Sequence, residues 1–412
     1  MTYFYAHLTV QNTATPRVVN EDVSQVWTEG QCAGSRIEAL LVWRRQGDFG
    51  GFDPSLPPSK IVLSPLMEKR IALRQGAGES FMNRMLSTAV LLLAASFAPA
   101  EEIRVATYNV EHWGQRFDTR QLAAWAKTQP KSEELAAMIK AERNQDDEDN
   151  WEVATVIAHP KLNPDVIFFQ EGCGQEDLEY FNKKWMNGAY SYIKVFPSNS
   201  GRGQEIGVMI KDGFKVLEVR DQYHLEKDTV DKSFATREGE EPSEAIKENR
   251  LFARGPAFVL IQSPSGYKFW AGTNHQKSKS GNDVNVTKWR NREAARTNEI
   301  IKDLAKTGVD VIFGGDTNDE LGYQEFEQEA GGDAISLLEG KDGQVKLVTR
   351  ELSDKGEISF GGYSRDRFRS FIDHMYVSKS LAGRVVSVNV YKEGVAPVAS
   401  DHYPVMTVIR TP

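Results

Sequence analysis

Six short clusters of acidic, amide and histidine side chains follow or interrupt apolar runs between residues 103 and 409. They are Asn109 with Glu111, Gln170 with Glu171, Asn274 with His275, Asp316 with Asn318, Asp373 with His374, and Asp401 with His402. Carboxylate and amide oxygens are hard ligands that suit Mg²⁺. A bound Mg²⁺ would neutralise charge that develops when a phosphoester is cleaved, and an Asp or His could take the proton of an attacking water. The residue types therefore favour phosphoester hydrolysis, provided that the fold brings the clusters together.

Each member of this set, taken alone, has a simpler explanation. An Asp after a strand usually caps a turn or a helix, and a lone Glu171 could be an acidic residue at a helix start. Asp373 is harder to explain in this way, because it lies inside an apolar strand and a buried carboxylate needs a partner. The functional interpretation therefore depends on the conjunction of the six clusters in order.

Apolar runs supply the strands that would hold these side chains on a rigid scaffold. The patterns predict strands over 103–110, 165–170, 205–211, 214–219, 250–262, 267–274, 309–314, 371–377, 385–391 and 403–409. The third and fourth are expected to pair around a turn at Asp212-Gly213. Helices are expected over 118–143, 151–159, 175–185 and 288–306, with an acidic loop at 145–150 and a surface excursion at 223–249. The mixture predicts an α/β (α+β) four-layer sandwich, with two packed mixed β-sheets flanked by helices.

The first hundred residues differ from the rest. Residues 1–81 show no sustained period, whereas 82–100 combine a basic start, an uncharged apolar run and a small-x-small end, as a secretory signal peptide does. Because such a peptide works at the start of a chain, we expect translation to begin at Met82 or Met85. Residues 1–81 would then be a start-site artefact or a disordered tail; the alternative is a genuine tail followed by a membrane anchor. A signal peptide predicts a secreted or periplasmic protein whose mature part is 101–412.

Composition sets further limits on the mature part. The chain is 40% hydrophobic and 26% charged, which suits a folded globular protein. No stretch is long and apolar enough to predict stable membrane insertion, and Cys173 is the single cysteine after residue 100. The net charge of −8 is unlike that of a protein that grips duplex DNA unaided. A nucleic-acid substrate would therefore need a local basic patch or metal ions to offset phosphate repulsion.

The six clusters, in this order, resemble the endonuclease/exonuclease/phosphatase superfamily, which includes pancreatic-type deoxyribonucleases, apurinic-site endonucleases, inositol-polyphosphate phosphatases and bacterial sphingomyelinases. The resemblance covers nearly all of 103–409. It is carried by the motifs Thr107-Tyr108-Asn109-Val110-Glu111, Phe169-Gln170-Glu171, Asn274-His275-Gln276-Lys277-Ser278-Lys279, Gly315-Asp316-Thr317-Asn318, Ile372-Asp373-His374 and Ser400-Asp401-His402. The usual Gly-Asp-Phe-Asn reads Gly-Asp-Thr-Asn here, which keeps both polar roles.

The resemblance implies a Mg²⁺ site, with Mn²⁺ or Ca²⁺ as alternatives, held by Asn109, Glu111, Glu171 and Asp401. Glu171 would be the principal ligand, and Glu111 stands where some members have an Asp. The implied catalytic residues are His275, Asp316, Asn318, Asp373 and His402. Asp316 would orient or deprotonate the attacking water, Asn318 would hold the scissile phosphate, and Asp373 would fix the tautomer of His402 beside the phosphate. Water would attack in line, with no covalent intermediate.

The Asn-His-x-Lys-Ser-Lys run and the signal peptide resemble secreted bacterial nucleases of this superfamily. Six basic residues near His275 could follow a phosphate backbone, or could simply be a solvated helix face: Lys277, Lys279, Lys288, Arg290, Arg292 and Arg296. We take Lys277 and Arg254 as candidate substrate-binding residues, although Arg254 is as well explained by a structural role. Nucleic acid is the expected substrate. A small phosphoester, such as an inositol phosphate or a lipid headgroup, and a catalytically inactive binding domain are the alternatives; the oligomeric state is open.

Overall fold

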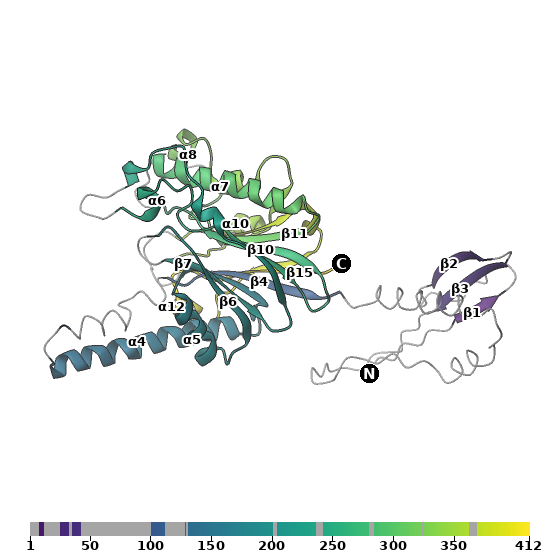
Figure 1. The fold of residues 1–412 in the computed structure, drawn as a ribbon, viewed down its shortest axis with the longest axis horizontal. Coiled ribbons are helices and arrows are strands. Elements are labelled where there is room, and N and C mark those ends of the chain that lie inside the picture. Colours follow the sequence, from purple (N-terminus) through teal and green to yellow (C-terminus); the bar gives the residue numbers. More distant parts are fainter. Residues whose placement is uncertain are drawn as a thin grey trace. The chain divides into compact units, whose positions relative to one another are not determined.

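The computed structural model describes three N-terminal strands and residues 100–111, 128, 131–200, 204–235, 242–279, 284–322, 325–361 and 369–412. The chain forms two units, 1–90 and 91–412. In the first unit, β1 (Leu8–Gln11), β2 (Gln25–Cys32) and β3 (Ser35–Val42) pair in the order β1-β3-β2 (Figure 1). The sequence pattern did not predict these strands. The start-site hypothesis for 1–81 and the signal peptide at 82–100, of which only Ala100 lies within the described residues, stay predictions.

The second unit contains two six-stranded sheets. The first has the order β12 (Val345–Leu347), β13 (Asp373–Ser378), β11 (Asp310–Asp316), β10 (Lys268–His275), β9 (Ala257–Gln262) and β8 (Lys215–Arg220). The second has the order β14 (Val385–Val390), β15 (Val405–Arg410), β4 (Glu102–Asn109), β5 (Val166–Gly172), β7 (Glu205–Lys211) and β6 (Tyr190–Phe196). Both sheets are mixed, because β10 and β11 run parallel, as do β4 and β5, among antiparallel neighbours.

The two sheets pack face to face, and helices cover both outer faces (Figure 1). Val105 and Phe168 of one sheet share the central core with Ile312 of the other. On the outer face of the β4 sheet lie α4 (Glu133–Ala158), α5 (Gln175–Trp185) and α12 (Ala396–Ala399). On the outer face of the β11 sheet lie α7 (Val284–Ala305) and α9 (Ala334–Glu339). The predicted four-layer α/β sandwich is therefore confirmed.

Short helices lie in the connections between the strands. They are η1 (Gln222–Leu225), η2 (Ser233–Ala235), α6 (Glu244–Lys247), α8 (Glu325–Glu329), α10 (Arg350–Asp354) and α11 (Lys379–Ala382). The 223–249 excursion contains three of them and is not wholly superficial, since Lys232 is fully buried within it. Among the described residues, no helix has the length and apolar character needed to cross a membrane.

Three sequence expectations about elements were wrong. β7 and β8 do not pair with each other: the turn at Asp212-Gly213 carries the chain from one sheet to the other, where β8 pairs with β9. The 145–150 segment is not a loop but part of the continuous helix α4, because acidic side chains on a solvated helix do not break it. The strand expected over 250–262 begins only at Ala257.

Candidate active site

The predicted clusters meet at one end of the sandwich. The parallel pairs place Asn109 beside Gln170 in one sheet and His275 beside Asp316 in the other. Asp373 pairs with Asp316 at the start of the antiparallel strand β13. Beneath them, Thr107 donates to Gln170 Oε1 at 3.0 Å, and Gln170 Nε2 donates to Thr273 at 2.9 Å. This buried chain of hydrogen bonds joins the two sheets and fixes the spacing of the strand ends that carry the site.

His402 and Asp373 form a buried pair. His402 Nδ1 lies 2.8 Å from Asp373 Oδ2, and the two side chains are 6% and 1% exposed. Because the carboxylate accepts, Nδ1 carries the proton and Nε2 faces Asp316 Oδ2 at 3.8 Å. Burial works to lower the pKa of His402, but the charge and hydrogen bond of Asp373, together with the charges of Asp316 and Asp401, outweigh it and raise that pKa to about 10. The geometry thus holds an imidazolium in a fixed orientation.

Asp316 stands between the two sheets and between the two histidines. Its Oδ2 accepts from Asn109 Nδ2 at 3.0 Å and lies 3.3 Å from His275 Nε2. Its Oδ1 accepts from the backbone N–H of Asn318 at 2.7 Å. Burial raises the pKa of Asp316 to about 7, against the opposing charge of His402. A carboxyl group with such a pKa is suited to exchange a proton with water near neutral pH.

Three further carboxylates crowd the same end of the sandwich. Glu111 Oε2 accepts from the backbone N–H of Asp401 at 3.1 Å, and Glu171 Oε1 lies 3.7 Å from His275 Nε2. Burial raises the pKa of Asp401 to about 6, and the charges of Glu111 and Glu171 add to that rise. Like charges held this close are unfavourable unless a cation accompanies them.

Three residues of the site have a backbone conformation that is unusual for residues other than glycine. Glu111, Glu171 and Asn318 have positive φ angles of 49°, 55° and 49°. Glu171 lies at an irregularity in the pairing of β5 with β7, between Phe169 and Gly172. Such a bulge changes the direction of a side chain relative to the regular alternation of a strand. Residues other than glycine rarely adopt this conformation, and they do so most often where function requires it.

The side chains present fit a divalent cation. The predicted ligands Glu111, Glu171 and Asp401 supply hard oxygen donors with the mutual repulsion that a cation would relieve. A second group, Asp316, Asp373 and His402, offers ligand atoms within 4.8 Å of one another and could also hold a metal ion. In that group the Nδ1 of His402 is already engaged by Asp373. The assignment of a metal ion to Glu111, Glu171 and Asp401 stays a prediction.

Arg254 has a structural surrounding. It is 7% exposed and donates to the backbone oxygens of His275 and Gln276 at 3.2 and 2.9 Å and to Gln204 Oε1 at 2.8 Å. These bonds hold the segment that follows β10. The structure therefore favours the structural alternative, and a role for Arg254 in substrate binding stays a prediction.

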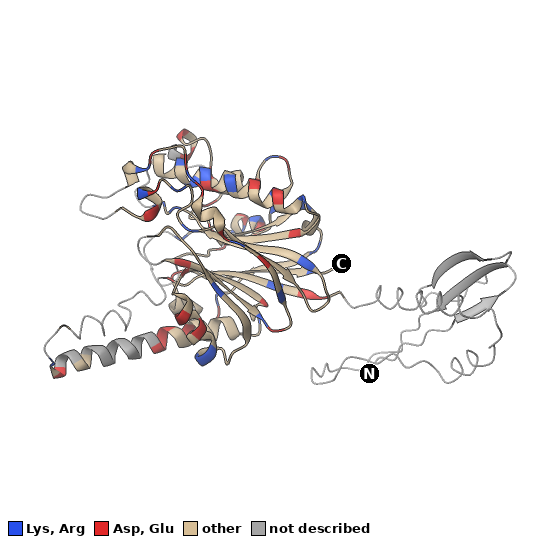
Figure 2. Cartoon of the chain, in the orientation of Figure 1, with Lys and Arg blue, Asp and Glu red and all other residues tan. Residues whose placement is uncertain are grey.

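The basic patch expected around His275 is largely neutralised within the fold. Lys279 lies 2.8 Å from Asp319, Arg292 lies 2.9 Å from Asp228, and Arg296 lies 2.8 Å from Glu226. Arg290 is fully buried near Asp319, and Lys277 Nζ lies 5.8 Å from the centre of the Trp289 ring. Figure 2 shows both acidic and basic residues along α7. These ion pairs favour the alternative interpretation as a helix face, and a track for a phosphate backbone stays a prediction.

Sequence reasoning did not single out the polar groups that support the site. Ser400 Oγ donates to the backbone oxygen of Asn109 at 2.8 Å and accepts from the backbone N–H of His402 at 3.1 Å. Ser359 Oγ accepts from the backbone N–H of Asp373 at 3.0 Å. Ser400 precedes the Asp-His motif directly, which was the available signal. Ser359 is distant in sequence and carried none.

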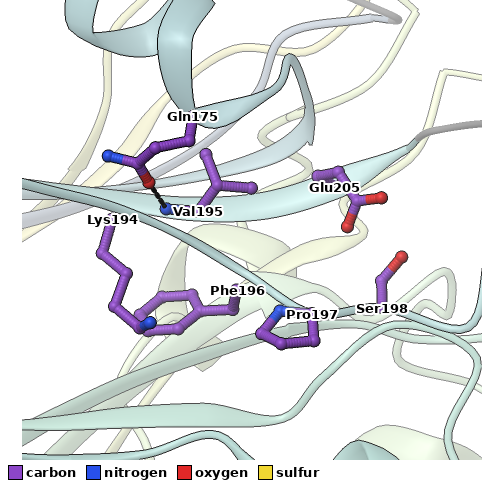
Figure 3. Close-up of a pocket in the computed structure, with 7 residues that line it drawn as sticks. All are labelled: Gln175, Lys194, Val195, Phe196, Pro197, Ser198 and Glu205. Carbon is purple, nitrogen blue, oxygen red and sulfur yellow. Dashed lines mark hydrogen bonds between the residues drawn. The ribbon is translucent and has the colours of Figure 1, made fainter.

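A pocket of about 410 Å³ lies at the end of β6 and the start of β7, where Glu205 pairs with Gly172 beside Glu171 (Figure 3). Its polar side chains are engaged within the protein. Gln175 accepts from the backbone N–H of Val195 at 2.7 Å, and Lys194 lies 3.4 Å from Asp221. None of the predicted site residues line this pocket, so it is separate from the candidate active site.

Comparisons with known proteins identify the family of the chain. The sequence profile of the Endonuclease/Exonuclease/phosphatase family matches residues 106–402, so the chain belongs to this family. A search of curated proteins found no match. Three solved structures with similar folds are an endonuclease/exonuclease/phosphatase family protein and a mannosyl-6-phosphatase, both from Bacteroides thetaiotaomicron, and truncated Caenorhabditis elegans TDP2.

These structures differ widely from the chain in sequence. In the same order, the identities are 16, 15 and 15%, and the TM-scores are 0.49, 0.48 and 0.46. The matches cover 76, 74 and 75% of this chain and 99, 99 and 97% of the other. The family therefore rests on the sequence profile, and the members of the family are hydrolases acting on phosphoester bonds.

Proposed function

We propose that residues 101–412 form a metal-dependent phosphodiesterase that cleaves nucleic acid by in-line attack of water. The observation that carries the proposal is the convergence of two histidines on Asp316. The Nε2 atoms of His275 and His402 lie 3.3 and 3.8 Å from Asp316 Oδ2. The family supplies the reaction class, and the acid, amide and histidine set of the site is complete.

The residues divide the reaction between them. Asp316 orients the attacking water and receives its proton, since burial holds its pKa near neutrality. The His402 imidazolium, kept protonated and aligned by Asp373, stabilises negative charge on the phosphate and can donate a proton to the leaving oxygen. Asn318 donates one side-chain N–H to the backbone oxygen of Gln276 at 3.1 Å, and the second N–H of the same amide would donate to a phosphate oxygen.

A divalent cation completes this arrangement. Asn109, Glu111, Glu171 and Asp401 would hold it, and it would neutralise charge on the phosphate and the leaving oxygen. Mg²⁺ is the cation that best suits oxygen ligands of this kind, with Mn²⁺ as the alternative closest in chemistry. The excess of carboxylates over basic side chains at this end of the sandwich supports the proposal.

A small phosphoester is the second candidate substrate. The observation in its favour is the pairing of Lys279, Arg292 and Arg296 with acidic side chains, which removes most of the charge that a long phosphate backbone would contact. Lys277 stands beside His275 in sequence and remains the candidate contact to a neighbouring phosphate. A catalytically inactive domain is disfavoured, because such a domain would not need the strained acids and the buried His402–Asp373 pair.

Export completes the proposal. Residues 82–100 have the composition of a secretory signal peptide, and the mature protein would begin near Glu101. N-terminal sequencing of the native protein tests this directly. A start near Glu101 supports it, and recovery of residues from 1–81 overturns it.

The substrate is tested by incubating the protein and its His402→Ala variant with Mg²⁺ and each of plasmid DNA, RNA, inositol phosphates and sphingomyelin. We expect the protein to cleave DNA or RNA and the variant to lose that activity. Turnover of the small phosphoesters without cleavage of nucleic acid would replace the first candidate by the second. Failure on all substrates with Mg²⁺ and Mn²⁺ would overturn the enzymatic proposal.

A further inference from the structure

Lys279 stands at the centre of a buried ionic cluster next to the candidate active site. Its ammonium lies 2.8 Å from Asp319 Oδ1, 3.2 Å from Glu327 Oε1 and 3.6 Å from Glu320 Oε1. The side chains of Asp319 and Glu327 are fully buried, and that of Lys279 is 23% exposed. A phosphate could bind this ammonium only by displacing two buried carboxylates. Because Lys279 neutralises buried carboxylates of the protein, we assign it a role within the fold and not a contact with the substrate.

The cluster joins two segments that carry the reactive side chains. Asp319 belongs to the loop 316–320, which follows β11 and holds Asp316 and Asn318. Lys279 ends the described part of the segment 275–279, which follows β10 and begins with His275. Asn318 Nδ2 also donates to the backbone oxygen of Gln276 at 3.1 Å. The pairing of β10 with β11 already sets the spacing of His275 and Asp316. The Lys279–Asp319 ion pair is the charged link between the two segments beyond these strand ends.

Further hydrogen bonds hold the loop, and Asp319 takes part in several of them, including one from the backbone N–H of Glu320 to its Oδ1 at 3.2 Å. Thr317 donates to the backbone oxygen of Ile372 through both its N–H, at 2.9 Å, and its hydroxyl, at 2.8 Å. Asp319 Oδ2 accepts from the backbone N–H of Ala334 at 2.7 Å and lies 3.6 Å from Arg290 Nε. Oδ1 is the oxygen turned to Lys279. Loss of the ammonium would leave Asp319 and Glu327 buried with reduced compensation, which favours a shift of the loop.

We propose that Lys279 is a positioning residue, whose ion pair with Asp319 holds the loop that follows β11 against the segment that follows β10 and so keeps Asn318 in place beside Gln276. The proposal rests on the function proposed above. The burial of Lys279 works to lower its pKa, but the charge of Asp319 and its neighbours raises the pKa above its ordinary value, so the ammonium stays charged. A displacement of about 1 Å in a reacting group can cost roughly a hundredfold in rate.

The experiment compares Lys279→Met, Lys279→Arg and, as a matched control on α7, Lys302→Met, which removes an ion pair with Asp342 in which neither residue belongs to the two segments. Hydrogen exchange of the backbone amides of residues 316–320, measured by mass spectrometry, reports how firmly the loop is held and needs no substrate. Lys279→Met is expected to speed that exchange by roughly tenfold. Lys279→Arg and Lys302→Met are expected to leave it close to that of the unaltered protein.

Kinetics supply the second measurement. With a phosphodiester that the protein cleaves, Lys279→Met is expected to lower kcat about a hundredfold and to change KM by less than about threefold, and Lys279→Arg to recover most of kcat. Unchanged exchange over 316–320 in Lys279→Met overturns the proposal. A raised KM with unchanged kcat also overturns it, because it indicates direct contact with phosphate.

Two controls separate this proposal from the others. If Lys279→Met does not fold, Asp319→Asn removes the same ion pair with little change in the shape of the side chain. This variant is expected to speed hydrogen exchange of the amides in 316–320. Exchange as slow as in the unaltered protein contradicts the proposal. If the unaltered protein cleaves no phosphoester, the proposed function fails, while the exchange data still decide whether Lys279 holds the loop.

Discussion

Replacement of Asp373 by Asn tests the buried histidine pair most sharply. The change keeps the shape of the side chain but removes the charge that accepts from His402 Nδ1 at 2.8 Å. Asp373 is 1% exposed, so water does not screen this interaction. The pKa of His402 is raised from an ordinary 6.5 to about 10, with Asp373 the largest contribution in that direction. Without it, His402 is expected to lose both its fixed tautomer and its proton near neutral pH.

The expected loss is a thousandfold to ten-thousandfold in kcat. Replacement of the carboxylate behind a catalytic histidine by its amide has an effect of about this size, since the wrong tautomer is then favoured. Such a loss corresponds to about 4 to 5 kcal/mol of transition-state stabilisation. KM is expected to change little, because Asp373 does not contact the substrate.

The assay is the pH profile of kcat on a phosphodiester with a coloured leaving group. If His402 acts as an acid, activity falls as pH rises through its pKa, so the basic limb of the unaltered protein lies near pH 10 and that of Asp373→Asn moves towards 6.5. Asp342→Asn, which alters an exposed ion pair with Lys302, is the matched control. A kcat within tenfold of the unaltered protein, with the basic limb unmoved, would refute the assigned role of the pair.

Three further predictions address the metal, the core and the acid limit. Removal of divalent ions with a chelator is expected to abolish hydrolysis and Mg²⁺ to restore it; full activity after exhaustive chelation contradicts the metal role of Glu171. Gly315→Ala is expected to lower the free energy of unfolding by about 3 kcal/mol, because an added Cβ would lie 2.1 Å from the backbone oxygen of Asn274. In the control variant Gly383→Ala, the added Cβ meets nothing within 4 Å. Equal denaturant midpoints for the two variants would contradict this prediction. Burial lowers the pKa of His374 to about 4, so its contribution to stability is fully present above pH 6.5 and is lost as pH falls towards 4, by about 3 kcal/mol in all. His374→Gln is expected to flatten the pH dependence of unfolding between pH 7 and pH 4.5, and an unchanged slope would count against it.

The layers of the fold and the convergence of the site followed from the sequence because both depend on short-range patterns. A nearly continuous apolar run such as 165–170 is typical of a strand in a sheet that is covered on both faces. Polar residues directly after such runs lie at strand ends whatever the strand order is. The pairing of Asp373 with His402 followed from the family resemblance and from the need of a buried carboxylate for a partner.

Contacts between distant segments did not follow from the sequence. The basic residues of α7 looked like a patch because the acids that neutralise them, Asp228 and Glu226, lie some seventy residues earlier in the chain. The strand pairing of β7 and β8 was also misjudged, because a tight turn is compatible both with a hairpin and with a crossing between sheets. The bulge that directs Glu171 into the site depends on the register of β5 against β7, which no local pattern specifies.

The most direct test of the central claim is a crystal structure of residues 101–412 grown with Mn²⁺ and a phosphate analogue, with the metal located by its anomalous scattering. We predict an anomalous peak about 2.1 to 2.2 Å from a carboxylate oxygen of Glu171, with the phosphate within hydrogen-bond distance of His402. A metal bound elsewhere, or a phosphate that reaches neither Asp316 nor His402, would contradict it.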